Sequence, residues 1–310
     1  MRTICAALLC LASLTLSAQQ VADTLFLYEI LKPGYPEGKG PLILLDEGHH
    51  NFHTTTGRYM PFSDFLRRDG YVVKGLSERF TADNIKPARV LVIANALHER
   101  NDSDWSLPTP SAFMPEEIGA VAHWVKQGGS LFLIADHMPF PGAAEDLAAA
   151  FGFTLYNGFA MRKQVDDPTI ANALTIPDIF TPGKGLGDHF ITRGRNQAES
   201  ITSVRTFTGE AFSVPDGATP LIVLDDSFEL LMSQVAWQFD KDCEKLPAKG
   251  LVQGACMDFG KGRIVVFGEA AMFSAQIQGG KTRMGMNAPD AKQNPQFLLN
   301  IIHWLDRLDK

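Results

Sequence analysis

Residues 124–139 read WVKQGGSLFLIADHMP, and this stretch decides the fold class of the chain. The run 130–136 (SLFLIAD) is apolar up to its final acid, as expected of a strand that is buried on both faces. The segment before it, 115–126, carries apolar residues at helical spacing, begins with Pro115 and stops at Gly128-Gly129. A helix that leads directly into a doubly buried strand is half of a βαβ unit, so the stretch predicts a parallel sheet covered by helices.

The same alternation of strands and helices extends along the chain on both sides of this stretch. Further strands are predicted at residues 41–46, 71–73 and 89–95, and helices at 61–70, 142–151 and 294–308. After residue 200 the pattern is richer in strands, at 201–207, 221–224, 251–257 and 263–267, with a hairpin turn at 258–262. The sequence therefore predicts an α/β fold with a mostly parallel sheet, helices on both faces and a β-rich second half.

The composition describes an ordinary globular protein, with 310 residues of which 45% are hydrophobic and 20% charged. A formal net charge of -7 and the absence of a Lys/Arg cluster argue against nucleic-acid binding. Internal repeats and low-complexity linkers are absent from the sequence. We therefore predict a single domain over residues 19–310, with an irregular insertion at about 157–190 that is a candidate lid.

The first residues have the pattern of a secretory signal peptide. Arg2 is followed by an apolar run, residues 4–16, and then by small and polar residues, which predicts cleavage near Ala18. The run is too short to span a bilayer, and no later segment is long enough. We expect an exported protein, periplasmic or secreted, that retains Cys243 and Cys256 either as a disulfide or as two free thiols.

The densest polar cluster follows the strand predicted at 41–46 and reads DEGHHNFH over residues 46–53. Ligands of open α/β sheets bind beyond the carboxyl ends of the strands, so the position favours a functional role. His49 or His50 with His53 suit a divalent metal, with zinc favoured. The alternative is a polar loop whose histidines hydrogen-bond the backbone and fix its shape.

A second cluster, Asp136-His137, follows the strand at 130–136 and is expected at the same edge of the sheet. Glu269 follows the strand at 263–267, either as a general base or ligand or as the cap of the next helix. Farther along, His189 and Arg193 are candidate binders of an anionic or sugar-like substrate, and Arg58 is a third. A surface loop is the alternative for the 188–194 segment.

Four segments resemble the class I glutamine-amidotransferase-like superfamily: VLVIANAL (90–97), WVKQGGSLFLIADHMP (124–139), FGKGRIVVFGEAAMF (259–273) and NPQFLLNIIHWL (294–305). More narrowly, roughly residues 40–308 are similar to the exported bacterial proteins grouped as DUF4350, relatives of the ThuA-like and intraflagellar-transport GIFT domains. The resemblance implies a flavodoxin-like sheet flanked by helices. It does not imply amidotransferase activity, because catalytic members carry a nucleophilic cysteine where this chain has Asp136-His137.

The sequence thus predicts an exported, hydrolase-like enzyme that acts on a small polar or carbohydrate substrate, with metal assistance in one version. The expected metal ligands are His49, His53, Asp136 and His137, and the expected catalytic residues are Asp46, His50 and Glu269. The motifs of serine hydrolases, zincins, P-loop proteins and dinucleotide-binding enzymes are absent, so we expect no nucleotide cofactor. The alternative is a non-catalytic domain of the cell envelope that binds a glycan or peptide.

Overall fold

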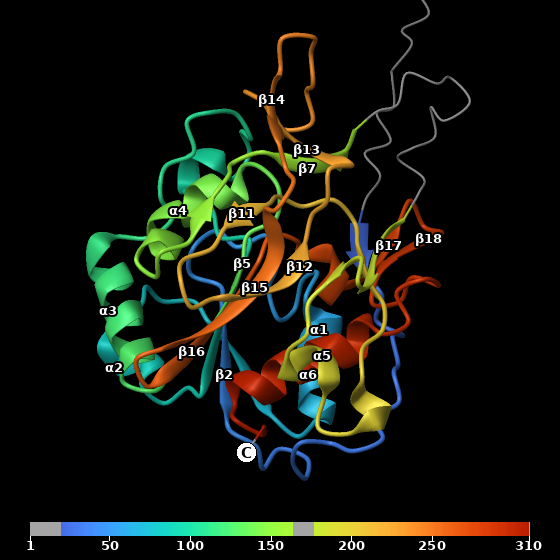
Figure 1. Cartoon of the computed structure of the whole chain (residues 1–310). Coiled ribbons are helices and arrows are strands. Elements are labelled where there is room, and N and C mark those ends of the chain that lie inside the picture. The colour runs from blue at the N-terminus through green and yellow to red at the C-terminus, as the bar shows by residue number, and fades with distance from the viewer. Residues whose placement is uncertain (1–19, 164–176, 310) are drawn as a thin grey trace, which may run out of the picture.

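The computed structural model describes residues 20–163 and 177–309 (Figure 1). The predicted signal peptide and residues 164–176 of the predicted insertion lie outside these ranges. Strands and helices alternate through the first half of the chain, as the apolar runs predicted.

Five parallel strands form one half of a large sheet. They are β3 (Val72–Leu76), β2 (Leu42–Asp46), β4 (Val90–Ala94), β5 (Ser130–Ile134) and β16 (Gly262–Phe267), in this spatial order. Numbered along the chain, the order is 2-1-3-4-5, which is that of flavodoxin-like sheets. Its topological switch point lies between β2 and β4, where the side chains that follow both strands can reach a common ligand.

Helices cover both faces of these strands because the strands are apolar on both sides. On β4, Val90 and Val92 belong to one core cluster, while Leu91 and Ile93 belong to the other. The first cluster includes side chains of α1 (Met60–Arg68) and α6 (Asn294–Leu305). The second includes side chains of α2 (Ala82–Ile85), α3 (Pro115–Lys126) and α4 (Phe140–Ala149). The prediction of helices on both faces is therefore correct, and α3 has its predicted bounds.

The other half of the large sheet is antiparallel except for the parallel pair β8 and β9. The predicted hairpin turn reverses the chain between β15 (Val252–Phe259) and β16, so β15 runs against the parallel strands. Beyond β15 come β12 (Thr219–Val223), β9 (Gly185–Leu186), β8 (Asp178–Pro182) and β10 (Val204–Thr206), with β11 (Phe212–Ser213) and β6 (Thr154–Leu155) alongside. The sheet is thus mixed, and the prediction of a mostly parallel sheet holds only for the five strands above.

Two small sheets were not predicted from the sequence. One comprises β14 (Glu244–Pro247), β13 (Phe228–Met232) and β7 (Phe159–Arg162), and it lies at the top of Figure 1, above β5 and β15. The other comprises β1 (Gln20–Ala22), β17 (Ala275–Gln278) and β18 (Thr282–Gly285). Separately, a short helix, α5 (Phe190–Arg193), packs against α6. The main chain of Met138, just after β5, donates a hydrogen bond to the carbonyl of Gly158, so the first small sheet adjoins the carboxyl ends of the parallel strands.

Cys243 and Cys256 are both free thiols, so the structure supports the second of the two alternatives that the sequence left open. Cys256 is buried in β15, opposite Val265 of β16. Within the described ranges, no helix is both long and apolar enough to cross a membrane.

Candidate functional site

The side chains that follow β4, β5 and β16 lie next to one another at the carboxyl edge of the parallel strands. Hydrogen bonds join the main chains of neighbouring strands up to this edge, from Asn95 N to the Ile134 carbonyl and from Ala135 N to the Phe267 carbonyl, at 2.9 Å each. The next polar side chain after this point is Asp136. Asp136 follows β5, the central strand of the three, and lies between Asn95, which follows β4, and Glu269, which follows β16.

Asn95 fixes the position of Asp136. Its side-chain oxygen accepts a hydrogen bond of 2.9 Å from the main-chain N–H of Asp136, whose Oδ1 in turn accepts from the N–H of His137 at 2.8 Å. The backbone of Asn95 is left-handed, with φ of 50°. Its Nδ2 is buried without a hydrogen-bond partner among the described residues, which leaves a donor available at the edge of the sheet.

Glu269 is buried at the end of β16. Its two carboxyl oxygens accept hydrogen bonds from the main-chain N–H groups of Ala271 and Met272, at 2.7 and 2.8 Å. It therefore caps the short 3-10 turn Ala271–Phe273, which was one of the two roles considered from the sequence. Burial and the nearby negative charge of Asp136 raise the pKa of Glu269 well above its usual value.

Glu210 is a third buried carboxyl at this edge, and the sequence analysis did not identify it. Oε2 accepts a hydrogen bond of 3.0 Å from the main-chain N–H of Tyr156, while Oε1 has no partner among the described residues. Burial, together with the charge of Asp136, raises the pKa of Glu210 well above its usual value. Its main-chain N–H bonds the carbonyl of Gly268 at 2.7 Å, which holds it against the end of β16.

No pattern in the sequence points to Glu210, because it lies in a loop of the antiparallel half. The one local signal is the glycine before it. Gly209 has φ of 85°, and a Cβ there would lie 2.1 Å from the carbonyl oxygen of Gly268. Only glycine allows the loop to approach β16 this closely. A glycine that is required directly before a buried carboxyl is the one feature of the sequence that could have drawn attention to Glu210.

His53 is buried beside the carboxyl cluster, in van der Waals contact with Tyr59. The two ring centroids are 4.3 Å apart, and Nδ1 of His53 has no hydrogen-bond partner in the described part of the chain. Burial, followed by the positive charge of Arg58 and electrostatic coupling to His137, lowers the pKa of His53 to about 3, so the His53 ring is neutral. The Tyr59 hydroxyl donates to the carbonyl of Ala270 at 2.8 Å, and burial raises its pKa.

Arg58 lies over the ring of Phe52, with its guanidinium carbon 3.7 Å from the ring centroid. Its Nε is buried without a partner among the described residues, and burial lowers its pKa. A half-buried guanidinium with an unused donor beside His53 suits the binding of a polar group, as the sequence predicted for Arg58.

His137 has a defined tautomer. Its Nδ1 lies 2.7 Å from the carbonyl oxygen of Met138, an acceptor, so Nδ1 carries the proton and donates it. Nε2 has no hydrogen-bond partner within the described residues. The ring stacks on Phe159, with centroids 4.6 Å apart and an interplanar angle of 11°.

His49 lies in a separate, fully bonded arrangement. Its Nδ1 is 2.8 Å from Oδ1 of Asp46, and its Nε2 is 2.9 Å from Oε1 of Glu117 on α3. Burial lowers the pKa of His49, but the hydrogen bonds and charges of the two carboxylates outweigh it and raise the pKa above its usual value. Both ring nitrogens are thus occupied by carboxylates, and the residue ties the loop after β2 to α3.

The other predicted site residues are spread over the surface. His50 is exposed, with φ of 47°, and its ring lies 3.9 Å from a carboxyl oxygen of Asp102. His189 contacts Cys256 at 3.6 Å, and Arg193 is paired with Asp188 at 3.3 Å. Arg263 and Asp258 influence the pKa of His189, so it lies near the β15–β16 turn. That turn is at the opposite end of β16 from Glu269, so His189 and Arg193 are not part of the cluster.

The structure also bears on the predicted metal ligands. Residues 20–163 and 177–309 contain no group of three or more His, Cys, Asp or Glu residues arranged to hold a metal ion. His53, Asp136 and His137 share one neighbourhood, whereas His49 bonds to its own two carboxylates. The metal site stays a prediction.

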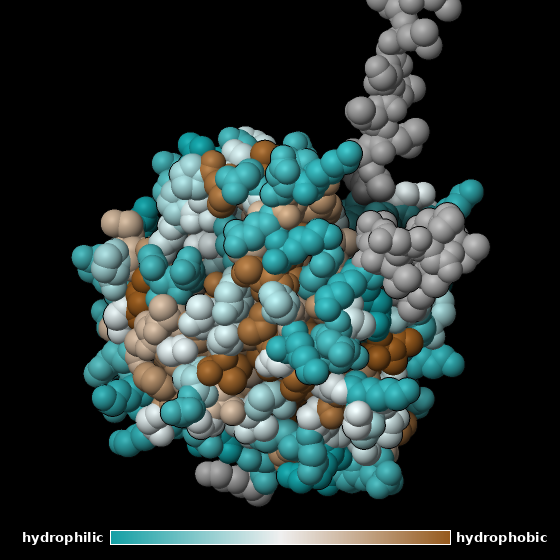
Figure 2. Space-filling view, turned by 45° about the horizontal axis from the view of Figure 1, so that its top comes forward, coloured by the Kyte–Doolittle hydropathy of each residue, from teal (hydrophilic) through white to brown (hydrophobic). Residues whose placement is uncertain are grey.

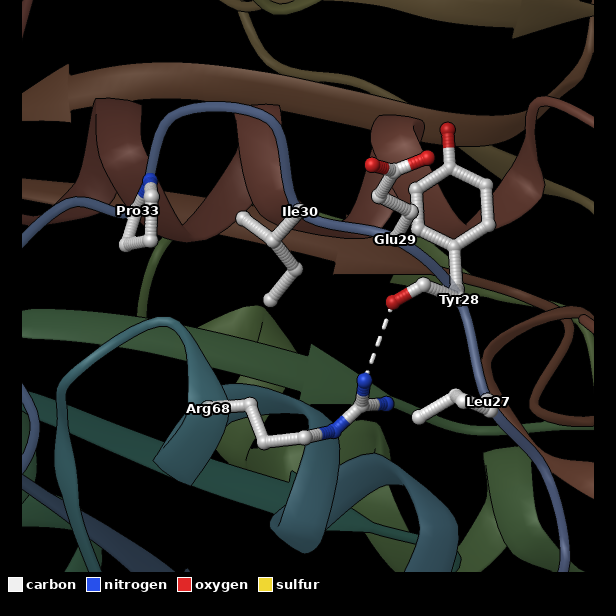
Figure 3. Close-up of a pocket in the computed structure, with 6 residues that line it drawn as sticks. All are labelled: Leu27, Tyr28, Glu29, Ile30, Pro33 and Arg68. Carbon is white, nitrogen blue, oxygen red and sulfur yellow. Dashed lines mark hydrogen bonds between the residues drawn. The ribbon is translucent and has the colours of Figure 1, made fainter.

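An open hollow of about 520 Å³ lies on another part of the molecule (Figure 3). It is lined by Leu27, Tyr28, Glu29, Ile30, Pro33 and Arg68. Arg68 is the last residue of α1 and bonds the carbonyl of Tyr28 at 2.9 Å. Because α1 runs back from the carboxyl edge of the sheet, the hollow lies toward the opposite edge and contains none of the predicted site residues.

No family model matches the chain, and no curated protein matches it. Among solved structures, it is similar to the mmIFT52 N-terminal domain, with a TM-score of 0.57 and 15% identity over 85% of this chain and 97% of that one. It is also similar to a ThuA-like protein from Bacteroides uniformis, with a TM-score of 0.46 and 11% identity over 88% of this chain and 94% of that one. A ThuA-like protein from Parabacteroides merdae gives a TM-score of 0.43 at 11% identity, over 86% and 90% of the two chains. At such identities the mmIFT52 match shows a shared fold and says nothing of activity.

Proposed function

We propose that this protein is a hydrolase-like enzyme that acts on a small polar or carbohydrate substrate by acid–base catalysis at the carboxyl edge of the parallel strands. The observation that carries the proposal is the cluster of Asp136, Glu210 and Glu269, in which burial and mutual repulsion raise the pKa of the two glutamates. A carboxyl that stays protonated near neutral pH donates a proton to a leaving group, and a nearby base activates water. Burying these carboxyl groups costs free energy of folding, and apolar residues at the same positions would avoid that cost.

Glu210 is the proton donor in this proposal, because its Oε1 is unpartnered among the described residues and burial raises the pKa of its carboxyl well above the usual value. His137 is the base in this proposal, because its Nδ1 donates to the Met138 carbonyl and its Nε2 has no hydrogen-bond partner among the described residues. His137 takes a proton from water, the water oxygen bonds to the electrophilic carbon of the substrate, and the bond to the leaving oxygen breaks as Glu210 protonates that oxygen. Glu210 regains its proton from the imidazolium through solvent, which completes the cycle.

The remaining polar groups bind or position. Asn95 Nδ2, His53 Nδ1 and Arg58 Nε are buried without partners among the described residues and supply hydrogen bonds for a polar ligand. Glu269 is a positioning residue here, since both of its oxygens bond to main-chain N–H groups. Asp46 likewise acts only through His49.

A divalent metal, zinc in the first instance, is a second version of the proposal. His53 Nδ1, Asp136 and His137 Nε2 have the donor chemistry that zinc accepts, whereas His49 would first have to leave Asp46 or Glu117. Elemental analysis of protein purified without chelators decides between the versions. One zinc per chain that is lost in His137→Ala supports the metal version, and a metal-free parent overturns it.

The main experiment compares Glu210→Gln with Glu145→Gln, a matched control on the exposed side of α4. Both proteins and the parent are assayed with 4-nitrophenyl glycosides and 4-nitrophenyl acetate over a range of pH. We expect the parent to hydrolyse at least one probe and Glu210→Gln to lower kcat by about 100-fold or more, with little change in KM, because it removes a general acid. No hydrolysis by the parent, or full activity in Glu210→Gln, would refute the proposal.

Two further parts of the proposal rest on the sequence. We propose that the chain is exported and cleaved near Ala18, and that it is a DUF4350-type member of the amidotransferase-like superfamily. N-terminal sequencing of the protein from its native host tests the cleavage site. The alternative is a non-catalytic domain that binds a glycan or peptide. The exposed aromatic side chain of Trp237 beside His137 is compatible with this alternative, because it indicates binding and not catalysis.

A further inference from the structure

Two exposed aromatic side chains, Trp237 and Phe239, lie near His137 on the solvent side of the carboxyl cluster. Trp237 and Phe239 are among the exposed large hydrophobic side chains, at 50% and 37% exposure. The indole lies 4.6 Å from His137 and 4.7 Å from Phe159, at interplanar angles of 71° and 60°. The His137 and Phe159 rings are almost parallel, and the plane of the indole is steeply inclined to both of them.

The backbone holds Trp237 in this place at a cost. Its φ is 66°, in the left-handed region that a bulky residue rarely adopts. The flanking segment is pinned to residues 105–107 by hydrogen bonds from Leu107 N to the Gln234 carbonyl at 3.0 Å and from Ala236 N to the Trp105 carbonyl at 2.9 Å. Backbone strain and exposure of a large apolar side chain are both unfavourable for folding. Trp237 has both, and because its side chain is half exposed, burial in the core does not offset them.

Interactions lead from His137, which contacts Trp237, and from the adjacent Asp136 to buried polar groups that lack partners. His137 interacts with His53, whose Nδ1 is unpartnered, and Asp136 interacts with Glu210, whose Oε1 is unpartnered. Gln253, which donates to the carbonyl of Glu210 at 3.1 Å, has an unpartnered Oε1 as well. Each statement holds for the part of the chain that the structure describes. A ligand that bonded such atoms would carry several hydroxyl or amide groups.

We propose that Trp237 is a stacking subsite for the C–H face of a neutral sugar ring whose hydroxyl groups reach Nε2 of His137. A pyranose has an apolar face and a rim of hydroxyl groups, so it matches a surface that is aromatic on one side and rich in unpaired donors and acceptors on the other. The clustered carboxyls disfavour an anionic ligand such as a phosphate ester. The inference rests on the proposed function and names the substrate class of that site.

Figure 2 shows the face of the molecule that includes its upper part: hydrophilic side chains cover most of it, and hydrophobic ones lie between them in several places. Exposed apolar side chains also occur elsewhere, at Leu27 for example, which is 78% exposed. Exposure alone therefore does not identify a subsite. Contact with the open histidine of the polar cluster is what distinguishes Trp237.

Isothermal titration calorimetry with the full mature chain tests the inference. The probes are maltohexaose, cellohexaose, xylohexaose and mannohexaose, with a proline-rich and an aromatic-rich peptide as the competing class. The variants are Trp237→Gly, which suits the left-handed backbone, Trp237→Phe, which keeps an aromatic face, and Leu27→Ala, the exposed apolar control. Thermal unfolding of each variant shows that it is folded.

We expect at least one hexasaccharide to bind with a Kd below about 1 mM, and Trp237→Gly to weaken it about tenfold or more. Trp237→Phe should lose less, and Leu27→Ala should bind like the parent. Binding of none of the sugars, binding of a peptide instead, or unchanged affinity in a folded Trp237→Gly protein overturns the inference.

The outcome is separable from that of the proposed function. Sugar binding that depends on Trp237 in a protein without hydrolytic activity keeps the subsite and refutes the enzyme. Hydrolysis with an unchanged KM in Trp237→Gly keeps the enzyme and refutes the subsite.

Discussion

Replacing His49 by alanine removes the link between two buried carboxylates. The imidazole bonds Asp46 at 2.8 Å and Glu117 at 2.9 Å, and all three side chains are buried. Its ring also packs between Phe80 and Phe113, at centroid distances of 4.6 and 4.7 Å. The substitution therefore tests whether His49 has the structural role that its bonds indicate.

The expected cost follows from the bonds that are lost and those that remain. A hydrogen bond to a charged group contributes about 1.5–3 kcal/mol, and breaking a buried ion pair costs about 3–5 kcal/mol. After the substitution Asp46 still accepts from Gly48 N and Asn51, and Glu117 still accepts from main-chain N–H groups. These donors keep both carboxylates partly satisfied, so we expect a loss near the lower end, about 3 kcal/mol in the free energy of unfolding.

The cost should depend on pH. Despite the opposing effect of burial, the carboxylates raise the pKa of His49 above 6.5, so its contribution is complete below about pH 6.5 and is lost as the pH rises through the raised value. Although burial raises the pKa of Glu117, the hydrogen bonds from Met114 N and His49 lower it below 4.5. Its contribution is present above about pH 4.5 and is lost as the pH falls through the lowered value. The difference between parent and variant should therefore be largest near pH 5–6 and smaller at about pH 9.

Urea unfolding followed by circular dichroism at these pH values measures the difference. His50→Ala is the matched control, because His50 is the neighbouring residue and is exposed, and it should change stability by less than about 0.5 kcal/mol. A cost below about 1 kcal/mol for His49→Ala, or one equal to that of His50→Ala, contradicts the assignment of a buried ion pair.

Three further predictions concern other parts of the fold. Gly209→Ala should cost more than about 1 kcal/mol because its Cβ would meet a carbonyl, whereas Gly217→Ala, with φ of 87° and open space around it, should cost less in the same urea assay. In the mature protein a thiol reagent should modify Cys256 only after unfolding, since Cys256 is buried and burial raises its pKa to about 12; rapid reaction of both Cys243 and Cys256 in the native state would contradict this. His303→Ala should cost about 3 kcal/mol, because it removes the partner 2.6 Å from Oδ2 of the buried Asp69 while Oδ1 still accepts from Gly34 N; thermal unfolding measures this cost, with His123→Ala on the exposed side of α3 as the control.

The parallel half of the fold could be predicted because its signals are local. The strands β2, β4 and β5 are buried on both faces, and their apolar runs are read directly from the sequence. The polar residue that follows a buried run then falls at the carboxyl edge, which is why Asp136 after β5 and Glu269 after β16 were placed at the site. In the second half, the hairpin turn between β15 and β16 was predicted correctly, whereas the pairing of β12 with β15 depends on tertiary contacts and not on any pattern within the strands.

The site itself could be predicted only in part, because burial is not visible in a loop sequence. His49 and His50 are adjacent and chemically identical, yet one is enclosed by carboxylates and the other is exposed. Glu210 belongs to the cluster without any motif around it, and His189 lies at the far end of the sheet despite its polar setting. Residue type and position in a strand set the candidates, whereas contacts between distant segments select among them.

The distribution of backbone strain supports a functional role for the carboxyl edge. Non-glycine residues with positive φ are His50, Asn95, Thr208, Trp237 and Arg307 within the described residues. The first four flank the edge, after β2, after β4, beside Glu210 and over His137, and only Arg307 is elsewhere. The same edge holds two carboxyls with raised pKa values and buried polar atoms that lack partners. Backbone strain and buried carboxyls each oppose folding, so their coincidence at the edge where flavodoxin-like sheets bind ligands supports the proposal that a ligand binds there.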